Sequence, residues 1–325
     1  MNVGLYTADP APYRIAAAQR PEIALRTLSP LHPDLADLDA IVIDAAGAPL
    51  YSLARASLAR GVHVFARPRT ALTVRQLVVL REAASRAGRR LRLAGSWGES
   101  RPLKSLRRSF HQGADAARHL RVVRRLSAGA SVDDATFEEL AFFIALTDAP
   151  VSSVACAQPD SPGPPVARFM TVTAPGLVAA IAVTSLECGP LREAIAAAGT
   201  KTCHFAASDD GVHRLTVSAS DSGGVIRKTE LTQHSLDALS VEVETFLAAL
   251  DAPHEAASDQ RALAAWSRAA LLWDAARTSL EHGGAPVPVV ERALLTNTNP
   301  PPLRLIVGGG TDGPAHARPT LTVVR

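Results

Sequence analysis

Two carboxylic acids four residues apart are the first candidates for chemistry in this sequence. Asp134 and Glu138 stand in the stretch DDATFEEL, just after Ser131. Residues four apart share one face of a helix, so the two carboxylates would lie close together. Two nearby carboxylates can raise one pKa and so provide a general acid. The alternative is that Asp134 or Ser131 caps the helix while Glu138 is solvated.

A group of arginines is the second candidate, as a pocket for an anion. Arg67 and Arg69 follow one predicted strand, and Trp97 and Arg101 follow the next predicted strand of the same sheet. Guanidinium groups bind a carboxylate or a phosphate through two parallel hydrogen bonds, so these residues could line a ligand pocket. The alternative is a solvated basic rim.

Cysteine and histidine spacing predicts no metal site. Cys156, Cys188 and Cys203 show no CxxC spacing, and His204 and His213 have no companions at metal-ligand spacing. An odd number of cysteines argues against a disulfide framework and indicates a reducing compartment. The chain begins without a basic segment followed by an apolar one, and its apolar runs are too short to span a membrane. We therefore expect a cytoplasmic protein without a membrane partner.

Composition excludes a nucleic-acid partner and indicates two domains. The 325 residues include 34 Lys and Arg against 31 Asp and Glu, a net charge of +3 that is scattered along the chain. Aromatic residues are only 4% of the total, too few for base-stacking surfaces. With 47% hydrophobic residues, the chain can bury the cores of two domains.

The first 120 residues alternate between strand and helix patterns. Two long helices are predicted, one ending at Gly61 and one running from Thr73 to Gly88. The predicted strands are NVGLYT, IALRTL, DAIVID, VHVFA and LRLAG. This spacing predicts an α/β fold whose first domain, residues 1–120, is a Rossmann-like, doubly wound parallel sheet.

The pattern changes after the first domain. From about residue 151, short strands alternate with Gly, Pro, Ser and Asp turns, and two helices and a final strand, PVPV, follow. We predict a C-terminal α/β domain over residues 121–289 with a largely antiparallel open sheet, and a helix over 134–146 that packs back at the junction. Residues 290–325 are predicted to be an extension with two short strands.

The order of these elements resembles the glucose–fructose oxidoreductase/inositol dehydrogenase (Gfo/Idh/MocA) family over roughly residues 1–289. The resemblance rests on four stretches: LDAIVIDAAGAPLYSLARASLARGVHV, RPRTALTVRQLVVLREAASRAGRRLRLAG, ESRPLKSLRRSFHQGADAARHLRV, and VETFLAAL with SDQRALAAWSRAALLWDAARTSLEHGGAPVPV. It implies a dinucleotide-binding type of domain, followed by an α/β domain whose open sheet pairs with another subunit.

The loop after the first strand departs from the family pattern. Family enzymes bind NAD(P) with a Gly-rich turn that lets the backbone approach the diphosphate. Here the loop Thr7, Ala8, Asp9 has no glycine, prolines follow it, and Asp9 would repel a phosphate. The acidic residue expected after the second strand is also missing. We therefore expect no cofactor, with NAD(P) as the alternative if an altered turn still binds it.

The family's catalytic residues are also replaced. The lysine of its E-K-P motif aligns with Pro68, or with Arg67 after a one-residue gap. Proline has no proton to transfer, and arginine stays protonated, so neither replaces the lysine. The family's D-x-x-x-H motif aligns with Asp134 and Glu138, so the aspartate is kept and the histidine is not.

Three functions remain open at this stage. The first is a pseudoenzyme: a non-catalytic accessory subunit or ligand sensor that forms a homo-oligomer, or a hetero-oligomer with an active paralogue, through the C-terminal sheet. The second is an NAD(P)-dependent oxidoreductase that acts on a sugar-like alcohol with an altered cofactor loop. The third is a cofactor-free acid–base enzyme that uses Asp134 and Glu138 in the same cleft. We favour the first.

Overall fold

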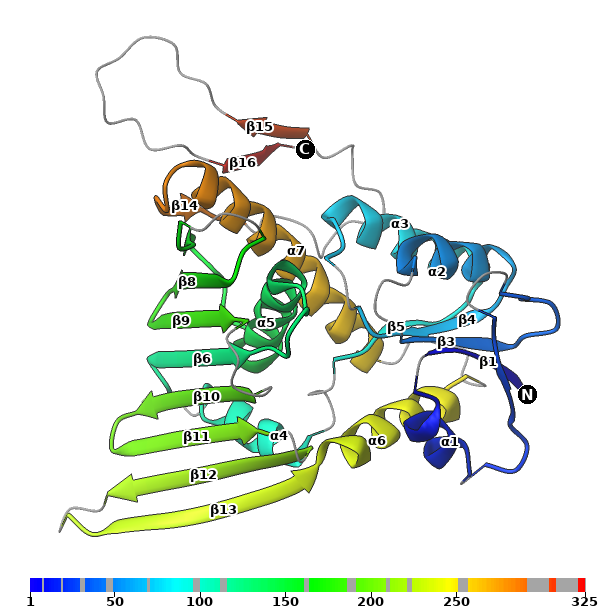
Figure 1. Cartoon of the computed structure of the whole chain (residues 1–325), viewed down its shortest axis with the longest axis horizontal. Helices are drawn as coiled ribbons and strands as arrows, with labels where there is room; N and C mark the ends of the chain where they lie inside the picture. The colour runs from blue at the N-terminus through cyan, green and yellow to red at the C-terminus, as the bar shows by residue number, and fades with distance from the viewer. Residues whose placement is uncertain are drawn as a thin grey trace.

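The computed structural model contains two large sheets that lie side by side (Figure 1). It describes residues 1–325 except 8, 19, 30–32, 45–48, 69–70, 96–99, 112–115, 161–163, 186–190, 209–210, 221–223, 251–256, 291–303, 308–320 and 325. Among the described residues, no helix combines the length and the apolar character that a membrane crossing requires.

The first sheet has five parallel strands in the order β2-β1-β3-β4-β5. Its strands are β1 (Asn2–Thr7), β2 (Ala24–Thr27), β3 (Ala40–Asp44), β4 (His63–Ala66) and β5 (Leu91–Leu93). Strands β3, β4 and β5 are buried along their whole length, as central strands of a doubly wound sheet must be. The structure thus confirms the predicted Rossmann-like fold.

Helices cover both faces of this sheet (Figure 1). One face carries α2 (Leu50–Ala59) and α3 (Val74–Ala87), which pack against each other. The helix α3 begins with the predicted cap, because the Thr73 side chain accepts from the Gln76 amide, and it ends at Gly88 with φ of 61°. The other face carries α1 (Ala11–Ala18) and α6 (Ser235–Ala248).

The helix α6, which covers one face of the first sheet, comes from the second half of the chain. Val243, Phe246 and Leu247 of α6 are buried in one apolar cluster with Val3 and Phe65 of the first sheet. The rings of Phe65 and Phe246 lie 5.4 Å apart between centroids. A core of the first sheet is therefore completed by residues that lie about 150 positions after β5, its last strand in the sequence.

The second sheet has nine strands in the order β13-β12-β11-β10-β6-β9-β8-β7-β14. All of its pairings are antiparallel except the central one between β6 and β9. Its strands are β6 (His119–Arg125), β7 (Ser153–Ala157), β8 (Ala167–Ala174), β9 (Leu177–Thr184), β10 (Leu191–Ala198), β11 (Lys201–Ala207), β12 (Val212–Ser220), β13 (Ile226–His234) and β14 (Val287–Pro288). The predicted α/β fold with a largely antiparallel second sheet is confirmed.

The helices that pack on the second sheet include one that also contacts the first. Helices α5 (Val132–Thr147) and α7 (Ala257–Glu281) lie on one face of the second sheet, and α7 also packs against β5 and α3 of the first (Figure 1). The helix α4 (Arg101–Arg108) packs against α5 and against β11, β12 and β13. Strands β15 (Arg304–Val307) and β16 (Leu321–Val324) form a separate antiparallel pair. The residue 120 at which we placed the first boundary lies inside β6.

Candidate functional site

The carboxyl edge of the first sheet brings together residues far apart in the sequence. In a parallel sheet the carboxyl ends of all strands meet at one edge, and ligands of this fold bind there. Thr7 of β1 is the register partner of Asp44 of β3, and β4 ends one residue before Arg67. Asp44 and Arg67 therefore stand at the edge where a ligand would bind.

Asp44 is the centre of a buried hydrogen-bonded group. Its Oδ2 accepts from the Tyr13 hydroxyl at 2.5 Å and from Arg67 Nη1 at 2.8 Å. Burial, and then the adjacent Asp44, raise the pKa of Tyr13 far above its ordinary value, so its hydroxyl keeps its proton. Burial acts to lower the pKa of Arg67, but the nearby Asp44, Tyr13 and Glu138 act more strongly in the opposite direction. The pKa of Arg67 therefore lies above its ordinary value. Arg67 is therefore a fixed cation rather than a proton donor.

Arg192 of β10 binds two consecutive acids of α5. Its Nη2 lies 3.1 Å from Glu138 Oε1, and its Nε donates to Glu139 Oε1 at 2.8 Å. The guanidinium carbon also lies 5.2 Å from the centre of the Phe142 ring. Burial acts to lower the pKa of Arg192, but Glu139 and Glu138 raise it above its ordinary value. Arg192 therefore holds its charge and fixes both carboxylates.

These contacts form one site between the sheets, which we name the junction cluster and define as Tyr13, Asp44, Arg67, Glu138, Glu139 and Arg192. Glu138 is its central member, because it is close enough to raise the pKa of Arg67 and also contacts Arg192. The side chain of Glu138 is 20% exposed, whereas that of Glu139 is fully buried. Glu138 can therefore exchange a proton with a bound molecule, and Glu139 serves to hold Arg192.

Asp134 has a different position from the one its spacing suggested. Its Oδ1 accepts from the backbone amide of Ala71 at 3.0 Å, and its own amide donates to the Ser131 side chain, which caps α5. This contact ties the loop after β4 to the start of α5. The geometry supports a structural role for Asp134, and it leaves Glu138 as the acid that faces Arg67.

A histidine lies next to the junction cluster. His213 of β12 is buried, and its Nδ1 lies 3.0 Å from the hydroxyl of Ser100, the residue before α4. Burial, together with Arg192 and His234, lowers its pKa to about 4. His213 is therefore neutral near pH 7, and it can exchange a hydrogen bond with Ser100 but adds no positive charge to the site.

The remaining predicted ligand residues are distributed as follows. Arg101 is the first residue of α4; its side chain is exposed, and its amide donates to Gln233 Oε1 at 2.7 Å. Thr7 Oγ1 accepts from the Asp9 amide at 3.2 Å. Ala8, Arg69 and Trp97 lie outside the described residues. Of the predicted set, the structure brings together Arg67 and Glu138.

Sequence reasoning missed four members of the junction cluster and His213. Asp44 could have been found, because it directly follows a buried strand and such positions lie at the carboxyl edge. Arg192 was hidden because its strand was not predicted. Tyr13 carries no signal in the sequence, since its partner is 31 residues away.

The chain resembles known proteins in its fold rather than in its sequence. No protein-family model matches the sequence, and no curated protein matches it. Among solved structures, the UDP-N-acetylglucosamine 3-dehydrogenase GnnA from Acidithiobacillus ferrooxidans is 18% identical, over 87% of this chain and 98% of that chain, with a TM-score of 0.70. An oxidoreductase from Pseudomonas syringae is 13% identical, over 89% and 98%, with a TM-score of 0.73.

A third similar structure contains a cofactor. It is a variant of KijD10, a 3-ketoreductase from Actinomadura kijaniata, in complex with TDP-benzene and NADP. It is 15% identical over 86% of this chain and 98% of that chain, with a TM-score of 0.70. The chain has the Gfo/Idh/MocA dehydrogenase fold. Because a protein of this fold binds NADP, our expectation that no cofactor binds is wrong, and we abandon it.

The first turn of this Gfo/Idh/MocA-type fold differs from an open diphosphate cradle. The Asp9 carboxylate accepts from the Ala11 amide at 3.0 Å, at the start of α1. Pro10 and Pro12 have no N–H to offer. The Asp9 side chain is exposed, so it can turn away, and the exposed Arg14 supplies a cation one turn later. The groups of this turn that would hold a diphosphate are the Ala11 amide and Arg14, and Asp9 would compete for the amide.

Proposed function

We propose that the protein is an oxidoreductase that uses a nicotinamide dinucleotide and acts on a small polyhydroxylated molecule, such as a sugar or a sugar nucleotide. The observation that carries the proposal is the position of Glu138, a partly exposed carboxylate between Arg67 and Arg192. The fold shared with dehydrogenases and reductases supports the reaction class. The cofactor, when bound, supplies the hydride acceptor or donor.

In this proposal Glu138 takes the proton that an alcohol loses on oxidation, and returns it on reduction. Arg192 fixes the carboxylate by a contact of 3.1 Å from Nη2 to Oε1, so that Glu138 is held in place for a substrate hydroxyl. Arg67 remains cationic because Asp44 binds it, and it stabilises negative charge on the substrate oxygen as the proton leaves. Glu138 thus replaces a lysine as the proton-transferring group.

The first test separates cofactor binding from catalysis. Fluorescence titration with NADH and NADPH should show saturable binding of at least one of them. Oxidation of UDP-N-acetylglucosamine and of a panel of hexoses and polyols then identifies a turnover. Failure of both dinucleotides to bind at millimolar concentration would exclude the proposal.

The second test concerns Glu138 itself. Glu138→Gln keeps the shape and the contact with Arg192 but cannot accept a proton, so kcat should fall by about 10²–10⁴ while dinucleotide affinity is unchanged. Glu193→Gln is the matched control, because Glu193 lies on β10 beside Arg192 and its carboxylate contacts His204 at 3.6 Å instead. Equal turnover in Glu138→Gln and in the control would show that Glu138 does not transfer the proton.

A second candidate function, that of a dinucleotide-binding partner subunit, is favoured by the outer face of the nine-stranded sheet. Strands β8 and β9 alternate between buried and exposed positions, and their exposed face carries Phe169 and Val178, which are 48% and 43% exposed. Exposed apolar side chains on an open sheet face favour association of subunits. Native mass spectrometry should then detect a dimer or a mixed complex. Phe169→Glu should dissociate it, whereas Ile15→Glu, at an exposed apolar position on α1, should not.

A further inference from the structure

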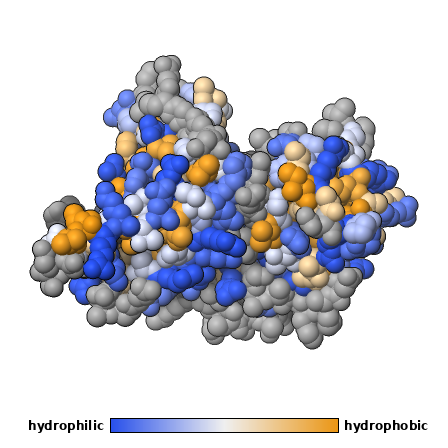
Figure 2. Space-filling model, turned by 90° about the horizontal axis from the view of Figure 1, so that it is seen from below, coloured by the Kyte–Doolittle hydropathy of each residue, from blue (hydrophilic) through white to orange (hydrophobic). Residues whose placement is uncertain are grey.

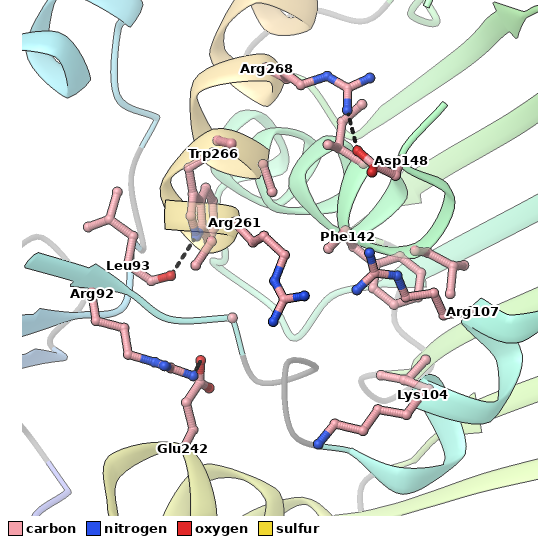
Figure 3. A pocket seen from close by; sticks show the side chains of 18 residues that line it. Arg92, Leu93, Lys104, Arg107, Phe142, Asp148, Glu242, Arg261, Trp266 and Arg268 are labelled. Atoms are coloured by element: carbon pink, nitrogen blue, oxygen red, sulfur yellow. Dashed lines mark hydrogen bonds and ion pairs between the residues drawn. The ribbon is translucent and has the colours of Figure 1, made fainter. Parts of the chain in front are cut away.

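A cavity of about 330 Å³ lies beside the junction cluster, between the C-terminal half of α5 and helices α4, α6 and α7 (Figure 3). No member of the junction cluster lines it. On α5 the lining extends from Phe142, whose ring also contacts Arg192, to Asp148 just beyond the helix end. The cavity therefore borders the junction cluster at Phe142 but is lined by other residues.

Cationic side chains dominate its lining. Five of them face it against two carboxylates, those of Asp148 and Glu242; the cationic residues are Arg92, Lys104, Arg107, Arg261 and Arg268. These residues come from β5, α4 and α7, so three elements distant in the sequence contribute positive charge to one space. Mutual repulsion disfavours such a grouping unless an anion is bound there.

The two carboxylates are already used by two of the cations. Arg268 Nη1 lies 2.9 Å from Asp148 Oδ1, and Arg92 Nη2 lies 3.3 Å from Glu242 Oε1. Within the described part of the chain, the side chains of Arg107 and Arg261 have neither an ion pair nor a hydrogen bond. The positive charge of these two guanidinium groups is thus not neutralised by the protein residues described.

The geometry of the cavity directs these groups to a common space. Figure 3 shows the Arg261 side chain extending from α7 into the cavity and the Lys104 and Arg107 side chains reaching toward it from α4. Trp266 and Phe142 form a buried aromatic wall, and the Trp266 indole N–H donates to the Leu93 carbonyl at 3.2 Å. The cavity thus has a fixed apolar wall on one side and solvent-accessible cations, Lys104 and Arg261, on the other.

We propose that this cavity binds a phosphate-bearing small molecule. Guanidinium groups bind phosphate through two parallel hydrogen bonds, and arginines supply most of the cations here. A volume of about 330 Å³ is at the lower end for ligand pockets, which suits a mono- or diphosphorylated metabolite rather than a dinucleotide. Since Phe142 lines this cavity and also contacts Arg192 of the junction cluster, occupancy is positioned to act on that cluster.

Calorimetric titration with inorganic phosphate, pyrophosphate and citrate tests the proposal. Phosphate and pyrophosphate should bind saturably, pyrophosphate more tightly. The double variant Arg107→Gln/Arg261→Gln should weaken both by at least tenfold. Arg55→Gln, at an exposed arginine on α2, is the matched control and should bind as the unmodified chain does.

Two further measurements separate this site from the dinucleotide site. NADPH affinity should be the same in the double variant and in Arg55→Gln, because neither change touches the carboxyl edge of the first sheet. Unchanged pyrophosphate binding in the double variant would assign that binding elsewhere and overturn the proposal. Binding of citrate without binding of phosphate or pyrophosphate would overturn the ligand class.

Discussion

Replacement of Asp259 by asparagine should destabilise the contact between the two halves of the chain. Asp259 lies on α7 and is 2% exposed. Its Oδ2 accepts from Arg90 Nε at 3.1 Å and Nη2 at 2.6 Å, and its Oδ1 accepts from Arg92 Nη1 at 3.1 Å. Arg90 and Arg92 are themselves buried, before and within the edge strand β5 of the first sheet.

The size of the effect follows from what remains after the change. Asp259→Asn keeps the shape but removes a negative charge that two buried guanidinium groups share, while the contacts of Arg92 with Glu242 and of Arg90 with the Ala249 carbonyl remain. Removing one partner of a buried ion pair costs about 3–5 kcal/mol. Because asparagine retains one hydrogen-bond acceptor, we expect the free energy of unfolding to fall by about 3 kcal/mol, the lower end of this range.

Urea unfolding followed by circular dichroism measures this loss. For a slope of about 3 kcal/mol/M, the midpoint of Asp259→Asn should fall by roughly 1 M. The control is Asp274→Asn, also on α7, whose partner Arg277 is exposed, and it should lose less than about 1 kcal/mol. Equal midpoints in the two variants would refute the argument that the buried arginines depend on Asp259.

The remaining predictions concern the first turn, a buried histidine and a helix cap. Asp9→Asn should tighten NADPH binding about fivefold, since about 1 kcal/mol of repulsion is removed. Asp34→Asn is the control, because it removes the charge from a carboxylate that likewise accepts from the amide two residues on, and it should leave NADPH binding unchanged; fluorescence titration measures both. The pKa of His213 falls from 6.5 to about 4 on folding, so as the pH is lowered the unfolded chain binds a proton before the folded chain does. The free energy of unfolding should therefore fall by up to about 3 kcal/mol between pH 6.5 and pH 4. His213→Asn should abolish that part of the pH dependence of the urea midpoint. Thr73→Ala removes the cap of α3 and should lower the free energy of unfolding by about 1 kcal/mol in the same assay.

Local sequence signals were sufficient for the first sheet. Strands β3, β4 and β5 are short buried runs, and the boundaries of the helix α3 at Thr73 and Gly88 were both predicted. Parallel strands that are buried on both faces leave a continuous apolar pattern that a single sequence can reveal.

The strand β10 shows where such signals fail. Its sequence, LREAIAAA, is rich in alanine and favours a helix, yet β6 and β11 pair with it on both sides. The pairing is set by distant segments, and a strand that contains Arg192, Glu193 and four alanines gives only a weak strand signal. Because Arg192 holds Glu138, the missed strand also concealed half of the junction cluster.

The surface distribution of apolar side chains could be predicted only in part. Figure 2 shows apolar surface interspersed with charged surface, including a group at the tip of the β12–β13 hairpin, near the 59% exposed Val225 and the 64% exposed Ile226. The sequence alone does not indicate which apolar side chains remain outside the core.

The packing of α6 against the first sheet has a consequence for biosynthesis. The ribosome completes all five strands of that sheet about 140 residues before it reaches α6, and until then the face formed by Val3, Val42 and Phe65 has no cover from Phe246. A nascent chain that pauses in this interval would expose an apolar, aggregation-prone face that chaperones can bind. A fragment that stops before residue 235 should for the same reason precipitate rather than persist as an independent unit.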